Sequence, residues 1–291
     1  MPGLQAIAYR MLGSLSEAED AVQESWLRLS RALTDHADGD SPIRNLPGWL
    51  TTTVSRICLD TLRTRASRRE DFVAVPLPVA AASPFAEPED EALLADSTGR
   101  ALLVVLDRLS PAERVAFVLH DAFAVPFDEI AHVVDRSPQT TKKLASRARL
   151  KVRGDDTLVP VSPAELARQR RIAERFLSAA RSGDLRAIVE LLAPDVVRRA
   201  DPAALSPGRP IEVRGADTVA KEITLFGQGS RCAEPAIVDG SVGILVAPRG
   251  RLRLVLALTI DAETDLITAY ELIADPARRS RLELAVLPAA S

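Results

Sequence analysis

Residues 127–150 read FDEIAHVVDRSPQTTKKLASRARL. Hydrophobic residues follow helical spacing on both sides of a short RSP segment, which predicts two helices joined by a tight turn. Four residues stand where a helix-turn-helix buries its side chains: Ile130, Ala131, Val134 and Leu144. The small alanine lets the two helices approach, so we expect the second helix to be a DNA-recognition helix.

Two positions depart from the usual pattern of this motif. Asp135 stands where many such motifs have a turn glycine, and Thr141 replaces a more usual apolar residue. The charge is more telling, because Arg136–Gly154 holds seven cationic side chains and no carboxylate, whereas the formal net charge of the chain is only -3. A solvated basic helix is the alternative, but a solvated face usually mixes charges of both signs, so the run favours a polyanionic partner.

The second helix carries side chains suited to DNA on its exposed side. Lysine and arginine neutralise phosphates and pair with guanine, while glutamine can address adenine. The candidate DNA-binding residues are Gln139, Thr140, Lys142, Lys143, Ser146 and Arg147. Arg149 to Arg153 are expected to touch phosphates or to lead into the next domain.

Composition sets the broad class. The chain has 291 residues, of which 47% are hydrophobic and 26% charged, as in ordinary globular proteins with about two domains. Cys58 and Cys232 have no metal-ligand or redox spacing, so we expect two buried thiols, no metal and no cofactor. No apolar run is long enough to span a membrane and no signal-peptide pattern is present, which favours a cytoplasmic protein.

The N-terminal module, residues 1–69, has the pattern of a helical bundle. Ser16 and Glu19 suggest a capping box that starts a helix through about Leu33. One stripe of this helix is expected in the core: Ala18, Val22, Trp26, Leu29 and Leu33. Another face is a partner surface or an ordinary exposed face, and it carries Asp20, Gln23, Glu24 and Leu27.

The next predicted helix, from Trp49 to Arg69, presents two different faces. Its apolar residues, Leu50, Val54, Ile57 and Leu62, are expected to point inward. Thr53, Arg56, Asp60 and Arg63 are spaced by three and four, so they share the other face. Arg63, Arg65, Arg68 and Arg69 form a second basic cluster at its end, where cations also favour the helix dipole.

The remaining chain divides at two segments without helical periodicity. Residues 70–96 are rich in proline and suit an extended linker, and residues 97–154 resume helical periodicity. A second linker spans 155–163. Residues 164–291 show two helices hinged at Gly183, a short strand and a helix, and then an antiparallel meander, which predicts an α+β domain.

Three segments together carry a family resemblance. AYRMLGSLSEAEDAVQESWLRL, WLTTTVSRICLDTLRTRASRRED and LSPAERVAFVLHDAFAVPFDEIAHVVDRSPQTTKKLASRARLKVRG closely resemble regions 2 and 4 of the extracytoplasmic-function (ECF) sigma factors of bacterial RNA polymerase. ARQRRIAERFLSAARSGDLRAIVELLAPDVVRRAD looks like the start of a SnoaL-like domain of the NTF2 superfamily. The chain thus resembles the sigma-J-like subgroup, with two all-α sigma modules, the first short at its N-terminus, and a C-terminal α+β, cone-shaped domain.

The resemblance assigns roles to faces already described. It implies transcription initiation with core RNA polymerase, through the β and β′ subunits, and with promoter DNA. Docking on the β′ clamp helices would fall on Asp20, Gln23, Glu24 and Leu27. Reading of the −10 element would fall on Asn45, Trp49, Thr53, Arg56, Asp60 and Arg63. For Trp49 the alternative is a place in the core. The recognition helix, Pro138 to Arg149, would read the −35 element.

The C-terminal domain leaves alternatives open. In the subgroup it contacts the sigma modules, but its DGGGK-type segment appears here as DPAALSPGRP, in which Asp201 alone aligns securely. SnoaL-like folds also include cyclases and isomerases, for which Asp195, Asp201 and Asp217 are possible bases. We expect a non-enzymatic sigma factor regulated by its own extension. The alternative is a DNA-binding protein fused to a cyclase, an isomerase or a ligand-sensing domain.

Overall fold

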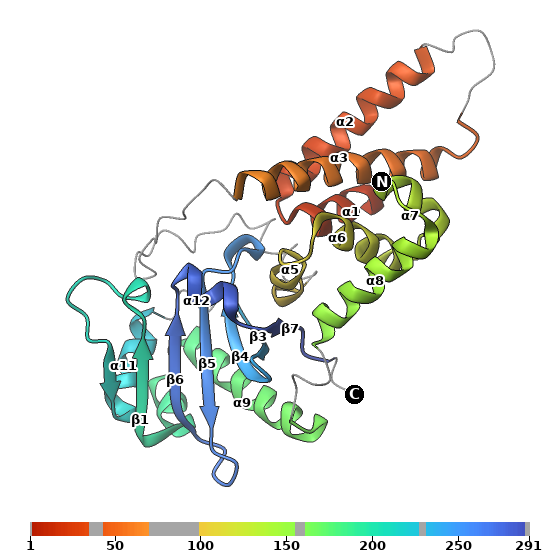
Figure 1. The fold of residues 1–291 in the computed structure, drawn as a ribbon. Helices are drawn as coiled ribbons and strands as arrows, with labels where there is room; N and C mark the ends of the chain where they lie inside the picture. Colours follow the sequence, from red (N-terminus) through yellow and green to blue (C-terminus); the bar gives the residue numbers. More distant parts are fainter. Residues whose placement is uncertain (1, 35–42, 70–98, 155–160, 227–230, 289–291) are drawn as a thin grey trace. The chain divides into compact units, whose positions relative to one another are not determined.

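The computed structural model describes residues 2–34, 43–69, 99–154, 161–226 and 231–288 (Figure 1). The predicted linker 70–96 and residues 155–160 of the second linker lie outside these ranges. The described residues form two compact units. The first holds residues up to 69 together with 106–150, and the second holds 99–105 together with the described residues from 151 onward.

The first unit is all α-helical. Its elements are α1 (Pro2–Leu12), α2 (Leu15–Thr34), α3 (Leu46–Arg69), α6 (Pro111–Phe117), the π-helix η2 (Val118–Ala122), α7 (Phe127–Val134) and α8 (Pro138–Arg153), the last turn of α8 belonging to the second unit. Helices α1, α2 and α3 pack on one another, and α3 also contacts α6 and α7. Tyr9, Met11 and Leu59 are fully buried among them. Ser110 starts α6 with the capping box that the SPAE sequence predicts.

Helix α2 corrects two details of the sequence analysis. It begins at Leu15, so Ser16 lies inside its first turn and does not cap it. Of the expected core stripe, Ala18 and Leu29 are buried, whereas Val22 and Trp26 are half-buried and Leu33 is 50% exposed. Val22 and Trp26 instead line an open groove together with Gln5 of α1.

The second unit is an α+β fold, as predicted. It contains the helices α9 (Pro163–Ser182), α10 (Leu185–Leu191), α11 (Ala216–Phe226) and α12 (Pro276–Arg281), the short helices η3 (Pro202–Ala204) and η5 (Pro248–Gly250), and most of α5 (Arg100–Leu106). The strands are β1 (Leu192–Ala200), β2 (Glu212–Arg214), β3 (Ala233–Val238), β4 (Ser241–Val246), β5 (Leu254–Ile260), β6 (Ile267–Ile273) and β7 (Leu284–Ala285). They form one sheet in the order β2-β1-β6-β5-β4-β3-β7.

Local sequence explains most of this sheet. Gly183 ends α9 in the left-handed conformation at φ 68°, where glycine is favoured. Asp239 and Gly240 both have positive φ in the β3–β4 turn, and β3 to β6 form the predicted antiparallel meander. Strand β1 is the exception, because the second of the two helices hinged at Gly183 was expected to continue to Val196. Pro194 cannot continue a helix, and β1 instead pairs in parallel with β6.

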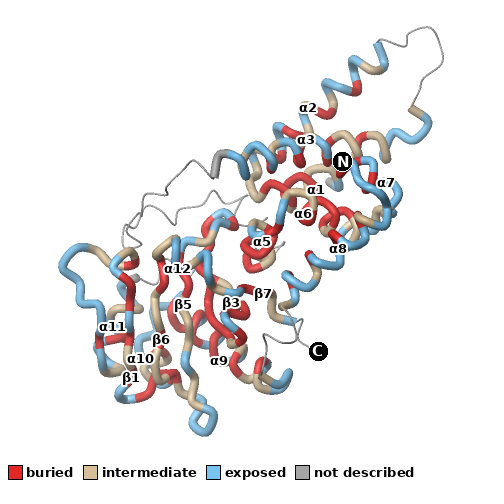
Figure 2. Tube along the Cα trace, in the orientation of Figure 1, coloured by how far each residue is buried: buried red, intermediate tan, exposed pale blue. Residues whose placement is uncertain are grey.

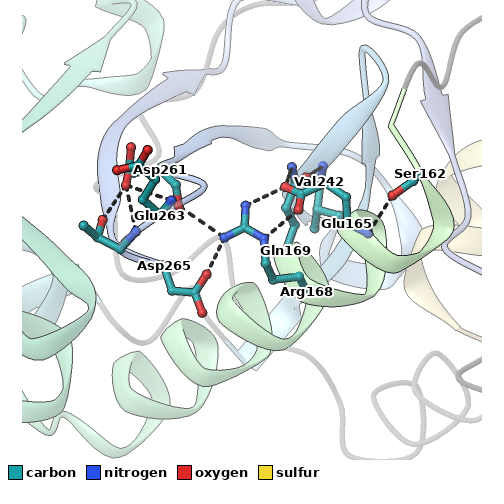
Figure 3. Close-up of polar contacts among 9 residues, drawn as sticks. Ser162, Glu165, Arg168, Gln169, Val242, Asp261, Glu263 and Asp265 are labelled. Atoms are coloured by element: carbon teal, nitrogen blue, oxygen red, sulfur yellow. Dashed lines mark hydrogen bonds and ion pairs between the residues drawn. The ribbon is translucent and has the colours of Figure 1, made fainter.

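Helices cover one face of this sheet, and a polar cluster fastens the longest of them. Helix α9 contacts β3 and β4, while α10 and α11 contact β1. Arg168 of α9 donates to Glu165 at 2.5 Å, to the Asp261 carbonyl at 3.2 Å and to the carboxylate of Asp265 (Figure 3). Gln169 accepts a hydrogen bond from the backbone N–H of Val242 at 3.0 Å. The cluster therefore ties the start of α9 to β4 and to the β5–β6 turn.

Candidate nucleic-acid interface

Helices α7 and α8 form the predicted helix-turn-helix. Its framework residues are all buried: Ile130, Ala131, Val134 and Leu144. Asp135 takes the turn position with φ 56°, a left-handed conformation that aspartate tolerates better than most residues. The turn is closed by the N–H of Arg136, which donates to the carbonyl of Ala131 at 3.1 Å.

Thr141 shows how a polar residue fits a position that is usually apolar. Its side chain is fully buried, and its hydroxyl donates to the carbonyl of Ser137 at 3.0 Å. The hydroxyl therefore has a hydrogen-bond partner within the helix, and burying Thr141 leaves no unpaired polar group.

The outer side of α8 presents the candidate −35 residues. Gln139, Lys142, Lys143, Ser146 and Arg147 are exposed, as the pale blue of α8 in Figure 2 illustrates. Within the part of the chain that the structure describes, Lys142 and Lys143 have no acidic partner. Arg147 lies 4.0 Å from Glu113, but its side chain remains 61% exposed. This face can therefore meet phosphates without first breaking a strong ion pair.

Two side chains near this face are already engaged. The hydroxyl of Thr140, which is half-buried, lies 2.8 Å from that of Ser137. Arg149 pairs with Asp121 of η2 at 2.5 Å, with both side chains about one-third exposed or less. Arg149 was expected to touch phosphates or to lead into the next domain, and in the structure its guanidinium joins α8 to η2.

The candidate −10 residues lie along α3 and at its start. Arg56, Asp60 and Arg63 are exposed, and Arg63 lies 3.5 Å from Asp60. Thr53 and Trp49 are half-buried, and the Thr53 hydroxyl donates to the Trp49 carbonyl at 2.8 Å. The predicted helical spacing therefore does bring this set to one side of α3.

Asn45 has a second role that the sequence analysis missed. Its side-chain oxygen accepts the N–H of Gly48 at 3.1 Å, which is the geometry of an N-cap. A Cβ at Gly48 would approach the Asn45 amide to 2.6 Å, so glycine fits the close approach. The sequence pattern Asn-x-x-Gly at the start of the helix could have predicted this N-cap.

Arg65, in the basic cluster at the end of α3, makes contacts within the first unit. It donates to the Leu12 carbonyl at 2.8 Å and pairs with Glu17. Its guanidinium thus joins α3 to α1 and α2. Arg63, two residues earlier, is exposed to solvent.

The candidate polymerase face of α2 borders a groove. Asp20 and Gln23 are exposed, Leu27 is 48% exposed, and Glu24 pairs with Arg28 at 2.9 Å. The groove has a volume of about 440 Å³ and is lined by Gln5, Glu19, Val22, Gln23, Trp26 and Leu27. Trp26, which was assigned to the core, therefore contributes to this surface.

Comparison with known proteins decides the family. The family models Sigma-70 region 2 and Sigma-70, region 4 match residues 1–68 and 99–152. The ECF RNA polymerase sigma factor SigJ of Mycobacterium tuberculosis is 38% identical over 251 residues, which cover 84% of this chain and 78% of that protein. This chain belongs to the ECF RNA polymerase sigma factors. Such proteins direct polymerase to promoters and are initiation factors, not enzymes.

Two further comparisons also match ECF sigma factors of M. tuberculosis. A probable ECF sigma factor of M. tuberculosis, SigI, is 35% identical over 262 residues, covering 88% of this chain and 84% of that protein. The crystal structure of M. tuberculosis SigJ matches 96% of this chain and 95% of its own, at 32% identity and a TM-score of 0.43. Among the described helices of this sigma factor, none has the length and apolar character needed to cross a bilayer.

The possible bases of the C-terminal α+β unit have structural explanations. Asp201 is buried, and its carboxylate accepts the N–H groups of Ala204 at 3.0 Å, Ala274 at 2.9 Å and Asp275 at 2.8 Å. Asp195 and Asp217 are exposed at the surface. Asp201 thus caps η3 and fastens the end of β1 to the end of β6.

The interior of the same unit holds one strong ion pair. Arg198 is 2% exposed and pairs with Glu222 at 2.8 Å, while also donating to the Pro210 carbonyl at 2.8 Å. Burial raises the pKa of Tyr270 well above its usual range, so its phenol stays protonated. No trio of His, Cys, Asp or Glu in the described ranges is arranged to hold a metal ion.

Proposed function

We propose that this sigma factor uses three helix faces to direct core RNA polymerase to promoters. The exposed side of α8 reads the −35 element in the major groove. The exposed side of α3, with Asn45 and Trp49 at its start, reads the −10 element, and the α2 face around Gln23 and Leu27 docks on the β′ clamp helices. The observation that carries the proposal is the exposed basic face of α8 above a fully buried helix-turn-helix framework.

Electrostatics sets the expected strength of the −35 contact. Each phosphate that a lysine or arginine neutralises releases condensed counterions, which makes binding fall with salt by a slope of about 0.9 per contact. Lys142 and Lys143 are neighbours on the exposed face and need no rearrangement to reach the phosphates of the DNA backbone. Base reading then falls to Gln139, Ser146 and Arg147.

Replacing both lysines tests this assignment. We expect Lys142→Ala plus Lys143→Ala to reduce the salt slope of promoter-fragment binding by about 1.8 and to weaken −35-dependent transcription. The matched control removes two exposed cations from α9 and α11, Arg171→Ala plus Lys221→Ala, and leaves both readouts unchanged. An unaltered slope and unaltered transcription in the lysine variant would refute the role of α8.

The C-terminal unit supports a second proposal, in which it regulates the sigma modules through α5. Residues 99–105 lie within the match to region 4 yet belong to the second unit. The N–H of Ala101 donates to Glu234 of β3 at 3.0 Å. Leu103 packs so closely on Gly250 that a Cβ there would lie 2.9 Å from it. The first helix of region 4 is thereby held against the sheet.

The end of region 4 has a similar connection, which strengthens this proposal. The carbonyl of Val152, in the last turn of α8, accepts the N–H of Val286 just after β7 at 2.8 Å. Since β7 pairs with β3, both ends of region 4 connect to the same edge of the sheet. A change in the C-terminal unit, or a ligand on it, would therefore act on region 4 from both ends. This intramolecular regulation, in the cytoplasm where polymerase works, requires no separate inhibitor.

Full-length chain carrying Glu234→Ala tests this regulation. Removing the carboxylate takes away the acceptor of the Ala101 N–H and weakens the attachment of α5 to β3. We therefore expect run-off transcript yield to change at least two-fold at equal polymerase binding. Glu263→Ala removes an exposed carboxylate from the β5–β6 turn and serves as the control. Equal yields from the two variants and the parent chain would count against regulation through α5.

A further inference from the structure

Two short segments of the C-terminal unit together form a cluster of arginines. Residues 248–253 read PRGRLR and residues 276–281 read PARRSR, so neither segment contains a carboxylate. The first segment joins β4 to β5, and the second is α12 (Figure 1). The guanidinium of Arg279 donates to the carbonyl of Leu252, which fastens α12 to the first segment. The arginine cluster, as named from here on, consists of Arg251, Arg253, Arg278, Arg279 and Arg281.

Most of the arginine cluster faces solvent without a carboxylate to neutralise it. Arg278 is exposed, pairs with Glu271 at 2.9 Å and lies 3.9 Å from Asp201. Several other exposed arginines of the same unit are paired in this way, as Arg199 is with Glu212 at 3.0 Å. Three members are exposed and have no carboxylate partner within the described ranges: Arg251, Arg253 and Arg281.

The cluster also brings like charges together. Burial and the positive charge of Arg253 lower the pKa of Arg279. The two carboxylates that act on Arg279 are already engaged, because Asp275 accepts the N–H of Arg278 at 2.8 Å and Asp201 accepts three backbone N–H groups. Like charges at close range repel, so an external anion that neutralises them binds favourably.

We propose that the arginine cluster binds backbone phosphates of DNA, which gives the C-terminal unit a DNA contact of its own. The planar guanidinium keeps its charge and can donate two parallel hydrogen bonds to one phosphate. Duplex DNA presents one negative charge per about 1.7 Å of its axis, so several arginines can be neutralised at once. The inference goes beyond the proposed function, since it holds whichever element α8 reads.

The family of the chain favours DNA over other polyanions. ECF sigma factors act on promoters, so a duplex is present wherever the chain works. Because the cluster and the sigma modules belong to one chain, DNA held by the modules meets the cluster at an effective concentration on the order of millimolar. Phosphate contacts carry no sequence information, so the cluster adds affinity without changing which promoter is chosen.

Neutralising the three unpaired arginines tests this contact in the full chain bound to core polymerase. We expect Arg251→Gln plus Arg253→Gln plus Arg281→Gln to reduce the slope of log affinity against log salt by about 2.7, for a promoter fragment and for a shuffled duplex alike. The matched control removes three exposed cations of α9 and α11, Arg171→Gln plus Arg175→Gln plus Lys221→Gln, and keeps the parental slope. Equal slopes in the two triple variants, measured by fluorescence anisotropy, would refute the contact.

Photocrosslinking identifies the partner of the cluster directly. Benzoylphenylalanine in place of Arg251 should crosslink to a labelled promoter fragment, whereas the same group in place of Arg171 should not. The linker offers a competing anion, because residues 87–91 include four carboxylates: Glu87, Glu89, Asp90 and Glu91. Crosslinks from position 251 that reach only this acidic run, with DNA present, would overturn the proposal in favour of an intramolecular contact.

The salt slopes also separate this inference from the proposed function. If Lys142→Ala plus Lys143→Ala keeps the parental slope while the arginine variant loses about 2.7, the role of α8 fails and the arginine cluster stands. The reverse pattern refutes the cluster and leaves the role of α8 intact.

Discussion

Replacing Asp201 should destabilise the C-terminal unit far more than removing an ordinary aspartate. Its carboxylate accepts three backbone N–H groups, and two of the donors, on Ala204 and Ala274, belong to buried residues. A buried donor left without a partner costs about 1–3 kcal/mol. Since Asp275 is only half-buried, its N–H can turn to water, and we expect Asp201→Ala to lower the unfolding free energy by about 4 kcal/mol.

Urea unfolding followed by far-ultraviolet circular dichroism measures this effect. With a slope of about 2 kcal/mol per molar urea, the midpoint for the C-terminal unit should fall by about 2 M. Tryptophan fluorescence gives a separate record of the first unit, which holds Trp26 and Trp49. Asp195→Ala, at an exposed aspartate, should stay within about 0.5 kcal/mol of the parent chain. Equal midpoints for Asp201→Ala and Asp195→Ala would refute the capping role.

Two further predictions concern the arginines and the polar cluster of α9. Arg65→Gln should lower the unfolding free energy of the first unit by about 2 kcal/mol, as measured by thermal melts, because Arg65 joins α3 to α1 and α2. Arg63 makes no such link, so Arg63→Gln should leave the unfolding free energy within about 0.5 kcal/mol of the parent chain. Hydrogen bonds from Arg168 and Gln169 lower the pKa of Glu165 from 4.5 to about 2. The ionised carboxylate therefore stabilises the folded unit fully above about pH 4.5, and this stabilisation is lost as the pH falls toward 2. Acid titration of Glu165→Gln should therefore show a shallower loss of stability across that range, and a loss as steep as that of the parent chain would contradict this role.

Periodicity and turn chemistry were enough to predict much of the fold. The helix-turn-helix follows from Ile130, Ala131, Val134 and Leu144, and the meander follows from alternation and from the turn at Asp239 and Gly240. Both are local patterns. Strand β1 was missed because its partner, β6, begins 75 residues later in the chain, and no local pattern records a parallel pairing over that separation.

Polar and charged residues were harder to assign than apolar ones, for a similar reason. Arg63 and Arg65 look alike in the sequence, but one faces solvent and the other reaches Leu12 and Glu17 across 50 residues or so. Asp201 looked like a possible base, but its carboxylate accepts the backbone N–H groups of Ala274 and Asp275, which directly follow β6. The roles of the candidate −10, −35 and polymerase residues stay predictions, since exposure permits a contact without identifying the partner.

Contacts within the protein limit how many cations of Arg136–Gly154 can bind DNA. Arg136 donates to the adjacent Asp135 carbonyl at 2.7 Å, and Arg149 pairs with Asp121. Lys151 and Arg153 belong to the second unit. Lys142, Lys143 and Arg147 remain on the exposed face of α8, so this helix should contribute a salt slope of about 2.7, and not the value above 6 that all seven charges would give. The total charge of the basic run is seven, but only these three of its side chains are predicted to contact the −35 element.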